Sequence, residues 1–203
     1  MIIIDDIEQG SPEWRALKAG IPSASNFDKI CTTKGEPSKQ SKGYMYELAA
    51  QVISDQIIES YTNQNMEEGK LREAESRKLY EMAHDVDVAK VAVVYQDEQK
   101  KYLCSPDGIV NGKYGLELKN PLPKTQVKYL LGGKLPTEYI LQVQGSLFIT
   151  GFYRWDFQSY VPGMPLLAIS VSRDETLITK LESELHTFVF ELDGVIRKLR
   201  EMQ

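Results

Sequence analysis

One stretch of the sequence decides the fold: Ser105-Pro106-Asp107-Gly108-Ile109-Val110-Asn111-Gly112-Lys113-Tyr114-Gly115-Leu116-Glu117-Leu118-Lys119. Within it, the pair Asn111-Gly112 is a strong signal for a hairpin turn. The flanking segments 107–110 and 114–119 are rich in apolar residues and are typical of β-strands. The stretch therefore predicts a β-hairpin.

The second strand of this hairpin has two different faces. Side chains alternate along a strand, so Glu117 and Lys119 project to one face. Leu116 and Leu118 project to the other face and are free to enter the core. A carboxylate and an ammonium group, two residues apart, therefore share one face of the predicted strand.

The length of the hairpin loop decides where Asp107 lies. With a three-residue loop, 111–113, Val110 pairs with Tyr114, and Asp107 sits opposite Glu117 with their Cβ atoms roughly 5 Å apart. A two-residue Asn-Gly turn would send Asp107 to the opposite face of the sheet. Two facing carboxylates therefore require the longer loop or a bulge.

Asp107, Glu117 and Lys119 form a set that suits metal-assisted hydrolysis. Two carboxylates at that separation repel each other unless a cation lies between them, and carboxylate oxygens are the ligands that Mg²⁺ or Mn²⁺ prefers. Such an ion polarises a phosphoryl oxygen. A neighbouring lysine can orient the attacking water, deprotonate it if burial lowers the pKa of the lysine, or stabilise the charge that develops on the phosphate. The set points to phosphodiester hydrolysis; the competing interpretation is an edge hairpin with a surface Glu-Lys pair.

Helical and strand-like segments share the rest of the chain. Apolar residues at a period near 3.6, together with capping residues, predict helices, and runs of β-branched and aromatic residues predict strands. The expected helices are 11–18, 44–58, 66–82, 137–148 and about 174–200, and the further strands are 88–95, 101–104, 152–161 and 166–171. Without a regular βαβ alternation, these elements predict an α/β fold in which helices flank one central mixed sheet. We expect a single domain over residues 1–203.

Composition narrows the class of protein. The chain has 203 residues, 42% of them hydrophobic, and a net charge of −5, which counts against a uniformly basic nucleic-acid-binding surface but not against a metal-dependent enzyme. Cys31 and Cys104 are too few and too far apart for a disulfide framework or a zinc site, so we expect a reducing cytosol. The apolar start, residues 1–4, is too short for a signal peptide or a membrane span.

The hairpin and its surroundings resemble a known nuclease core. Pro106-Asp107 followed by Glu117-Leu118-Lys119 is similar to the restriction-endonuclease-like PD-(D/E)XK core. Six segments, in order, resemble one branch of it, the lambda exonuclease or YqaJ-type viral recombinase family. They are Gly10-Ser11-Pro12-Glu13-Trp14, Gly20-Ile21-Pro22-Ser23-Ala24-Ser25, Gly69-Lys70-Leu71-Arg72-Glu73, Cys104-Ser105-Pro106-Asp107-Gly108, Gly115-Leu116-Glu117-Leu118-Lys119 and Gln142-Val143-Gln144.

This resemblance implies roles for residues near the hairpin. Asp107 and Glu117 would be metal-binding carboxylates, the Leu118 carbonyl a further ligand, and Lys119 the catalytic lysine, with Mg²⁺ as the cofactor and Mn²⁺ as a possible substitute. Glu73, on the helix before the sheet, would be a further catalytic acid.

Two of the implied catalytic residues have competing interpretations. A helix glutamate such as Glu73 is commonly a solvated residue, and Glu67, Glu68 and Glu75 compete for the same role. Gln144 matches a glutamine that would hold the water or the lysine, although a helix glutamine beside apolar residues is most often a boundary residue.

The resemblance also implies a pocket for the 5′-phosphate of a DNA end, formed by Lys18, Ser25 and Ser105. The family's best-known member has arginine at the position of Lys18, and lysine lacks the planar fork that grips phosphate bidentately. A further basic contact to DNA would come from Lys124 or Lys128.

The expected function is a Mg²⁺-dependent exonuclease that digests the 5′-ended strand of linear duplex DNA and leaves a 3′ single-stranded overhang. The resemblance implies a homotrimer that acts with a single-strand-annealing recombinase in the cytoplasm of a bacterial or phage-infected cell. Two alternatives stay open: an endonuclease of restriction or repair type with the same core, and a noncatalytic module that binds metal or DNA.

Overall fold

The computed structural model describes the backbone of residues 1–54 and 64–203 and the side chains of residues 1–54 and 71–203. The predicted hairpin lies at its centre. Its strands are β5 (Gly108–Val110) and β6 (Tyr114–Lys119), and Val110 pairs with Tyr114. The loop therefore has the three residues that facing carboxylates require. Asn111 and Gly112, at φ 48° and 67°, supply the left-handed conformations of its turn.

The hairpin belongs to a five-stranded mixed sheet of order β2-β5-β6-β7-β8. The other strands are β2 (Val88–Ala89), β7 (Arg154–Ser159) and β8 (Leu167–Ser172), of which β2 and β8 form the edges. The pair β6 and β7 is parallel, and the other pairs are antiparallel. A parallel pair needs a long crossover. Here the crossover contains α4 (Pro123–Gly132), η2 (Thr137–Tyr139) and α5 (Ile140–Thr150).

A second sheet has three strands in the order β1-β3-β4. They are β1 (Ile2–Ile4), β3 (Val93–Tyr95) and β4 (Leu103–Cys104). The prediction of a central mixed sheet flanked by helices is confirmed, but that of one continuous strand over 88–95 is wrong, because β2 and β3 pair in different sheets. Strand β1 and helix α4 were not among the expected elements, although Pro123 at the start of α4 and Gly133 at its end are ordinary helix boundary residues.

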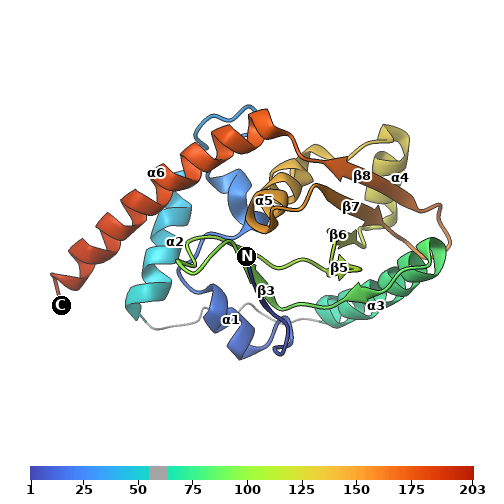
Figure 1. Cartoon of the computed structure of the whole chain (residues 1–203), viewed down its shortest axis with the longest axis horizontal. Helices are drawn as coiled ribbons and strands as arrows, with labels where there is room; N and C mark the ends of the chain where they lie inside the picture. Colours follow the sequence, from blue (N-terminus) through green and yellow to red (C-terminus); the bar gives the residue numbers. More distant parts are fainter. Residues whose placement is uncertain (55–63) are drawn as a thin grey trace.

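Of the other described helices, whose arrangement Figure 1 shows, the 3₁₀ helix η1 (Ala24–Lys29) was not expected, and the rest agree with the sequence patterns. They are α1 (Pro12–Lys18), α2 (Ser41–Ser54), α3 (Gln64–His84) and α6 (Glu175–Arg200). Ser11 caps α1 by accepting from the Trp14 N–H, and Asp174 caps α6 by accepting from the Leu177 N–H. The expected end of the helix over 44–58 lies outside the described residues.

Helices cover both faces of the five-stranded sheet. On one face, Tyr80 of α3 packs with Leu116 and Leu118. The other face carries Glu117 and lies against α5, which joins α2 and α6 in the largest core cluster. No helix within residues 1–54 and 64–203 combines the length and apolar character that crossing a membrane requires.

Close packing explains one glycine of the hairpin. Gly115 lies opposite Trp155 in the parallel ladder, and a Cβ at position 115 would stand 2.3 Å from the Trp155 ring. Glycine therefore allows the tryptophan to lie flat over the strand, two residues before Glu117.

Candidate active site

Asp107 and Glu117 are neighbours at one end of the hairpin. Gly108 pairs with Leu116, which brings the preceding Asp107 beside Glu117. The Leu118 N–H donates to Asp107 Oδ2 at 2.6 Å and fixes that carboxyl group against β6. Burial and the facing Glu117 raise the pKa of Asp107 well above its ordinary value. The two carboxylates therefore form a site that favours a cation or a shared proton.

Glu117 is buried, at 2% exposure, and holds two partners. Its Oε1 accepts from Gln142 Nε2 of α5 at 2.7 Å and lies 2.5 Å from Lys119 Nζ. Lys119 Nζ also lies 5.0 Å from the centre of the Tyr139 ring. The glutamate, the lysine and the glutamine thus form one connected group on the α5 face of the sheet.

The electrostatics of Lys119 differ from the expectation. Burial on its own lowers the pKa of a lysine, but the charges of Glu117 and Asp107 outweigh it, so the pKa of Lys119 lies above its ordinary value. The expectation of a pKa lowered by burial is therefore wrong for this arrangement. Lys119 is held as a cation that donates hydrogen bonds.

Glu73 reaches the hairpin through Arg77, one turn further along α3. Arg77 Nη2 donates to Glu73 Oε1 at 2.6 Å and to the Asp107 carbonyl at 2.9 Å. Glu75, one of the competing glutamates, instead accepts from the Tyr160 hydroxyl. The side chains of Glu67 and Glu68 lie outside the described residues. Among the glutamates that can be placed, Glu73 is the one joined to the candidate site.

The structure does not bring Gln144 to the carboxylates. Its Nε2 donates to the Ser172 carbonyl, and its Oε1 accepts from the Asp174 N–H, so it ties α5 to the start of α6. Gln142 takes the place expected for Gln144. Two residues separated by two positions on a helix point about 200° apart, so only one of the pair faces the sheet.

The sequence interpretation missed two residues of the site, Gln142 and Arg77. For Gln142 a signal existed, because the Gln-Val-Gln segment offers two glutamines on different faces of α5. For Arg77 the only signal was its spacing of four residues from Glu73, which is ordinary in helices.

The donor set fits a hard divalent cation. Across the described residues, no three or more histidine, cysteine, aspartate or glutamate side chains cluster as a metal site would. The candidate donors are the facing carboxylates of Asp107 and Glu117. The Leu118 carbonyl is the further ligand that the family resemblance implies. Mg²⁺ uses few protein oxygens and retains several waters, so this small set suits it. The raised pKa of Asp107 supports the fit, because a cation would relieve the repulsion that causes it.

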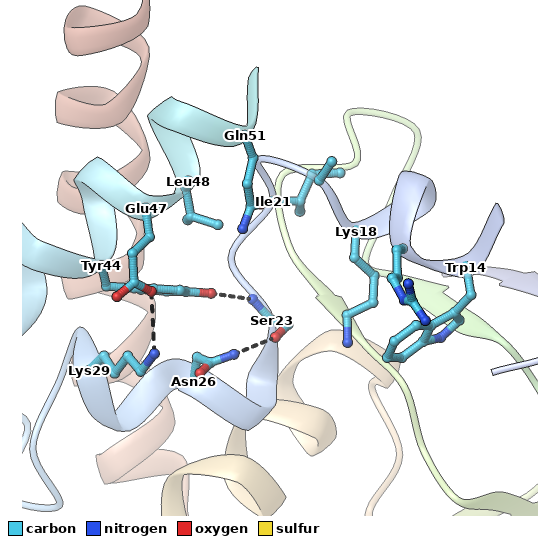
Figure 2. A pocket seen from close by; sticks show the side chains of 12 residues that line it. Trp14, Lys18, Ile21, Ser23, Asn26, Lys29, Tyr44, Glu47, Leu48 and Gln51 are labelled. Carbon is cyan, nitrogen blue, oxygen red and sulfur yellow. Dashed lines mark hydrogen bonds and ion pairs between the residues drawn. The ribbon is translucent and has the colours of Figure 1, made fainter. Parts of the chain in front are cut away.

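A pocket of about 270 Å³ lies between α1 and α2, with η1 at its base (Figure 2). Lys18 and Trp14 form one wall, and Lys18 Nζ lies 3.8 Å from the Trp14 ring centre. On the far wall, Lys29 pairs with Glu47 at 3.5 Å. Burial lowers the pKa of Lys18 to about 8, with a small opposing effect from Cys104. This lysine is a poorly solvated cation at the edge of a polar cavity.

The two expected phosphate-binding serines lie on segments that meet beside Lys18. A bridge between Ser23 and Leu103 sets the segment of Ser25 against β4, whose end leads to Ser105. Ser25 is exposed, with its hydroxyl 3.0 Å from that of Ser23. The Ser105 hydroxyl is buried and has no hydrogen-bond partner among the described residues. Of the three residues expected to bind the phosphate, Lys18 lines the pocket, whereas Ser25 and Ser105 do not.

Lys124 does not line this pocket; it is exposed in the first turn of α4. Lys128, on the next turn, stands 3.9 Å from Glu138. Of these two lysines after β6, Lys128 is the one placed in an ion pair with a glutamate.

Comparison with known proteins agrees with this geometry. The mixed sheet, with two carboxylates and a lysine at one end of its hairpin, defines a nuclease fold of the PD-(D/E)XK type. The model of the YqaJ-like viral recombinase domain matches residues 13–153, and the chain belongs to that family. No curated protein sequence matches the chain.

Solved structures extend the likeness over nearly the whole chain. An alkaline exonuclease, LHK-Exo, from Laribacter hongkongensis is 28% identical with a TM-score of 0.84, and the match covers 95% of this chain and 97% of that one. The same enzyme in complex with dAMP is 27% identical over the same shares, with a TM-score of 0.83. A phage-related exonuclease from Haemophilus somnus 129PT is 15% identical, with a TM-score of 0.65 over 91% and 99% of the two chains, and shares the fold. Family and neighbours together support a nuclease, and specifically an exonuclease.

Proposed function

We propose that this protein is a Mg²⁺-dependent 5′-to-3′ exonuclease that digests one strand of linear double-stranded DNA and leaves a 3′ single-stranded overhang. The observation that carries this proposal is the connected group of Asp107, Glu117 and Lys119 on one face of the hairpin. Mn²⁺ is the expected substitute for Mg²⁺, since both prefer oxygen ligands.

Each residue of the group has a separate task. A cation held by these carboxylates would supply Lewis acidity toward the scissile phosphate and toward water. Asp107 and Glu117 supply the negative charge that holds it, with the Leu118 carbonyl as a further oxygen. Lys119 donates hydrogen bonds beside them and stabilises charge that develops on the phosphate. Gln142 fixes the orientation of Glu117, and Glu73 is the further acid of the site.

We propose that Lys18, Ser25 and Ser105 bind the 5′-phosphate of the DNA end. Lys18 contributes a desolvated cation, and Ser105 contributes a buried hydroxyl without a partner among the described residues. A relative that binds dAMP, a nucleoside monophosphate, supports a nucleotide site in this fold. Lys124 is the proposed further contact to the DNA backbone, where a single charge contributes through counterion release.

The remaining parts of the proposal concern assembly. We propose that residues 1–203 act as one nuclease domain, assemble as a homotrimer around the DNA, and deliver the exposed strand to a single-strand-annealing recombinase in the cytoplasm. These proposals follow from membership of the family. Light scattering at micromolar concentration tests the trimer, for which about three times the chain mass is expected.

The activity is tested by incubating the protein with linear or covalently closed plasmid, in the presence of Mg²⁺ or of EDTA. An exonuclease degrades only the linear DNA and only with Mg²⁺. Cutting of the closed plasmid would replace the proposal with an endonuclease, and degradation in EDTA would remove the metal from the mechanism. Strands labelled at the 5′ or 3′ end then give the polarity, and release from the 3′ end would overturn it.

A further inference from the structure

Arg77 makes an unusual set of contacts at the edge of the candidate site. Its guanidinium is almost fully buried, with the side chain 8% exposed, and it donates to the Asp107 carbonyl through both Nε at 3.2 Å and Nη2 at 2.9 Å. The same Nη2 donates to Glu73 Oε1 at 2.6 Å. One side chain of α3 thus holds the backbone of one acid and the carboxylate of another.

These contacts fix Asp107 at two points. Arg77 holds its carbonyl, and the Leu118 N–H holds its carboxylate. A rotation of the carboxylate away from Glu117 would break the hydrogen bond from the Leu118 N–H, and a shift of the Asp107 backbone would break those from Arg77. Glu73 is held through its Oε1, and its side chain is 34% exposed.

We propose that Arg77 is a positioning residue, which holds Asp107 in place for a divalent cation and keeps Glu73 beside the site, without touching that cation or the substrate. The proposal rests on the proposed metal-dependent function and adds to it the residue that organises the two acids. An arginine suits this task because its rigid fork reaches a carbonyl and a carboxylate together, whereas a lysine has one nitrogen for both.

The competing explanation is that Arg77 only attaches α3 to the sheet. Two neighbouring contacts already do this. Gln158 donates to the Ser76 carbonyl and hydroxyl, and Tyr80 donates to Asp156. Tyr80 lies on the same face of α3, three residues from Arg77, and is buried like it. Tyr80→Phe is therefore a matched control that removes an attachment of α3 without touching Asp107 or Glu73.

The first measurement is Mg²⁺ binding without DNA. Four proteins are dialysed against EDTA and then against buffer: wild type, Arg77→Lys, Arg77→Met and Tyr80→Phe. Their melting temperatures are then recorded at increasing Mg²⁺ concentrations. We expect the Mg²⁺ concentration at half-maximal stabilisation to rise about 10- to 100-fold in Arg77→Met, as is typical when a group that orients a metal ligand is lost. Arg77→Lys should fall between Arg77→Met and wild type, and Tyr80→Phe should match wild type even where it melts lower.

The second measurement is nucleotide release from linear duplex DNA at saturating Mg²⁺, well below each melting temperature. We expect kcat to fall in the order wild type, Arg77→Lys, Arg77→Met, with Tyr80→Phe at the wild-type value. Wild-type Mg²⁺ binding and kcat in folded Arg77→Lys and Arg77→Met would overturn the positioning role alone. Failure of Mg²⁺ to stabilise the wild-type protein would overturn the proposed metal dependence and this assignment with it.

Discussion

Two aspartates have opposite electrostatic environments: the buried Asp156 in β7, and the partly buried Asp107 just before β5. Arg154 donates to Asp156 from the same strand, β7, twice, at 2.7 and 2.5 Å, and Tyr80 of α3 donates to it once, at 2.5 Å. Burial opposes its charge, but these donors outweigh burial and hold the pKa of Asp156 below its ordinary value. Asp107 faces another acid, and its pKa is raised.

The difference separates a structural carboxylate from a functional one. Asp156 has its compensating cation inside the fold, so its charge stabilises the native state. Asp107 lacks an equivalent partner of its own, because Lys119 is bound to Glu117 and the Arg77 contact goes to the Asp107 carbonyl. A site whose like charges remain uncompensated by the fold is a candidate for an external cation. The two aspartates can therefore be tested as a matched pair.

Asp107→Asn should have the largest effect on activity. The substitution keeps the shape but removes one of two metal-binding carboxylates, so Mg²⁺-dependent nucleotide release should fall by at least about a thousandfold. The raised pKa means that folding favours protonated Asp107, so the wild-type protein loses stability as pH rises above the ordinary aspartate value of 3.8. In EDTA at neutral pH, Asp107→Asn should therefore melt at or above the wild-type temperature.

Added Mg²⁺ sharpens this result. It should raise the melting temperature of the wild-type protein and leave that of Asp107→Asn nearly unchanged. A variant that melts well below wild type in EDTA would show that Asp107 is a structural residue instead.

Asp156→Asn should show the reverse pattern. It leaves the Arg154 guanidinium without its carboxylate in a partly buried position, which should lower the free energy of unfolding by about 2 kcal/mol. The pKa of Asp156 lies below its ordinary value, so its contribution is present at neutral pH and is lost as pH falls through the folded-state pKa. Urea unfolding at pH 7 measures the loss. Nucleotide release per folded molecule should stay near wild type, and a large drop would contradict the separation of the two faces.

The sequence predicted the acids of the site better than the residues that support them. Strand alternation was enough to place Glu117 and Lys119 on one face. The position of Asp107 beside Glu117 depended on the loop length, which the sequence left open and the structure shows to be three residues. Arg77 acts on a backbone carbonyl thirty residues away in the chain, and no local pattern reveals such a contact. The break between β2 and β3 was equally hidden, because each strand is apolar and only long-range pairing assigns them to different sheets.

Gln142→Met and Gln144→Met form a second matched pair, with smaller effects. Gln142→Met removes a hydrogen bond to the buried Glu117 carboxylate, so activity should fall about tenfold with little change in melting. Gln144→Met leaves the Ser172 carbonyl and the Asp174 N–H without partners, so unfolding free energy should fall by about 1–2 kcal/mol with activity retained. Steady-state rates and thermal melting of both variants test this. Loss of activity in Gln144→Met with activity retained in Gln142→Met would instead assign the catalytic role to Gln144.

The smallest predicted effect concerns the pH dependence of the choice of DNA end. Lys18 has a pKa lowered to about 8, so it carries its charge at pH 7 and loses much of it by pH 9.5, while a terminal phosphate remains a dianion throughout. If Lys18 binds that phosphate, the ratio of digestion rates on 5′-phosphorylated and 5′-hydroxyl ends should fall about three- to tenfold over this range. Bound phosphate favours the charged lysine, which limits the fall. Taking the ratio at each pH cancels changes in the chemical step, which acts on both ends alike.

Lys18→Arg is the control for this pH effect, because arginine keeps its charge across the range. Its ratio should stay constant from pH 7 to 9.5, whereas Lys18→Met should show a low ratio at every pH. A ratio that falls equally in wild type and Lys18→Arg would assign the pH effect to another group. A high, constant ratio in Lys18→Met would remove Lys18 from the phosphate site, leaving the Asp107 and Glu117 site unaffected.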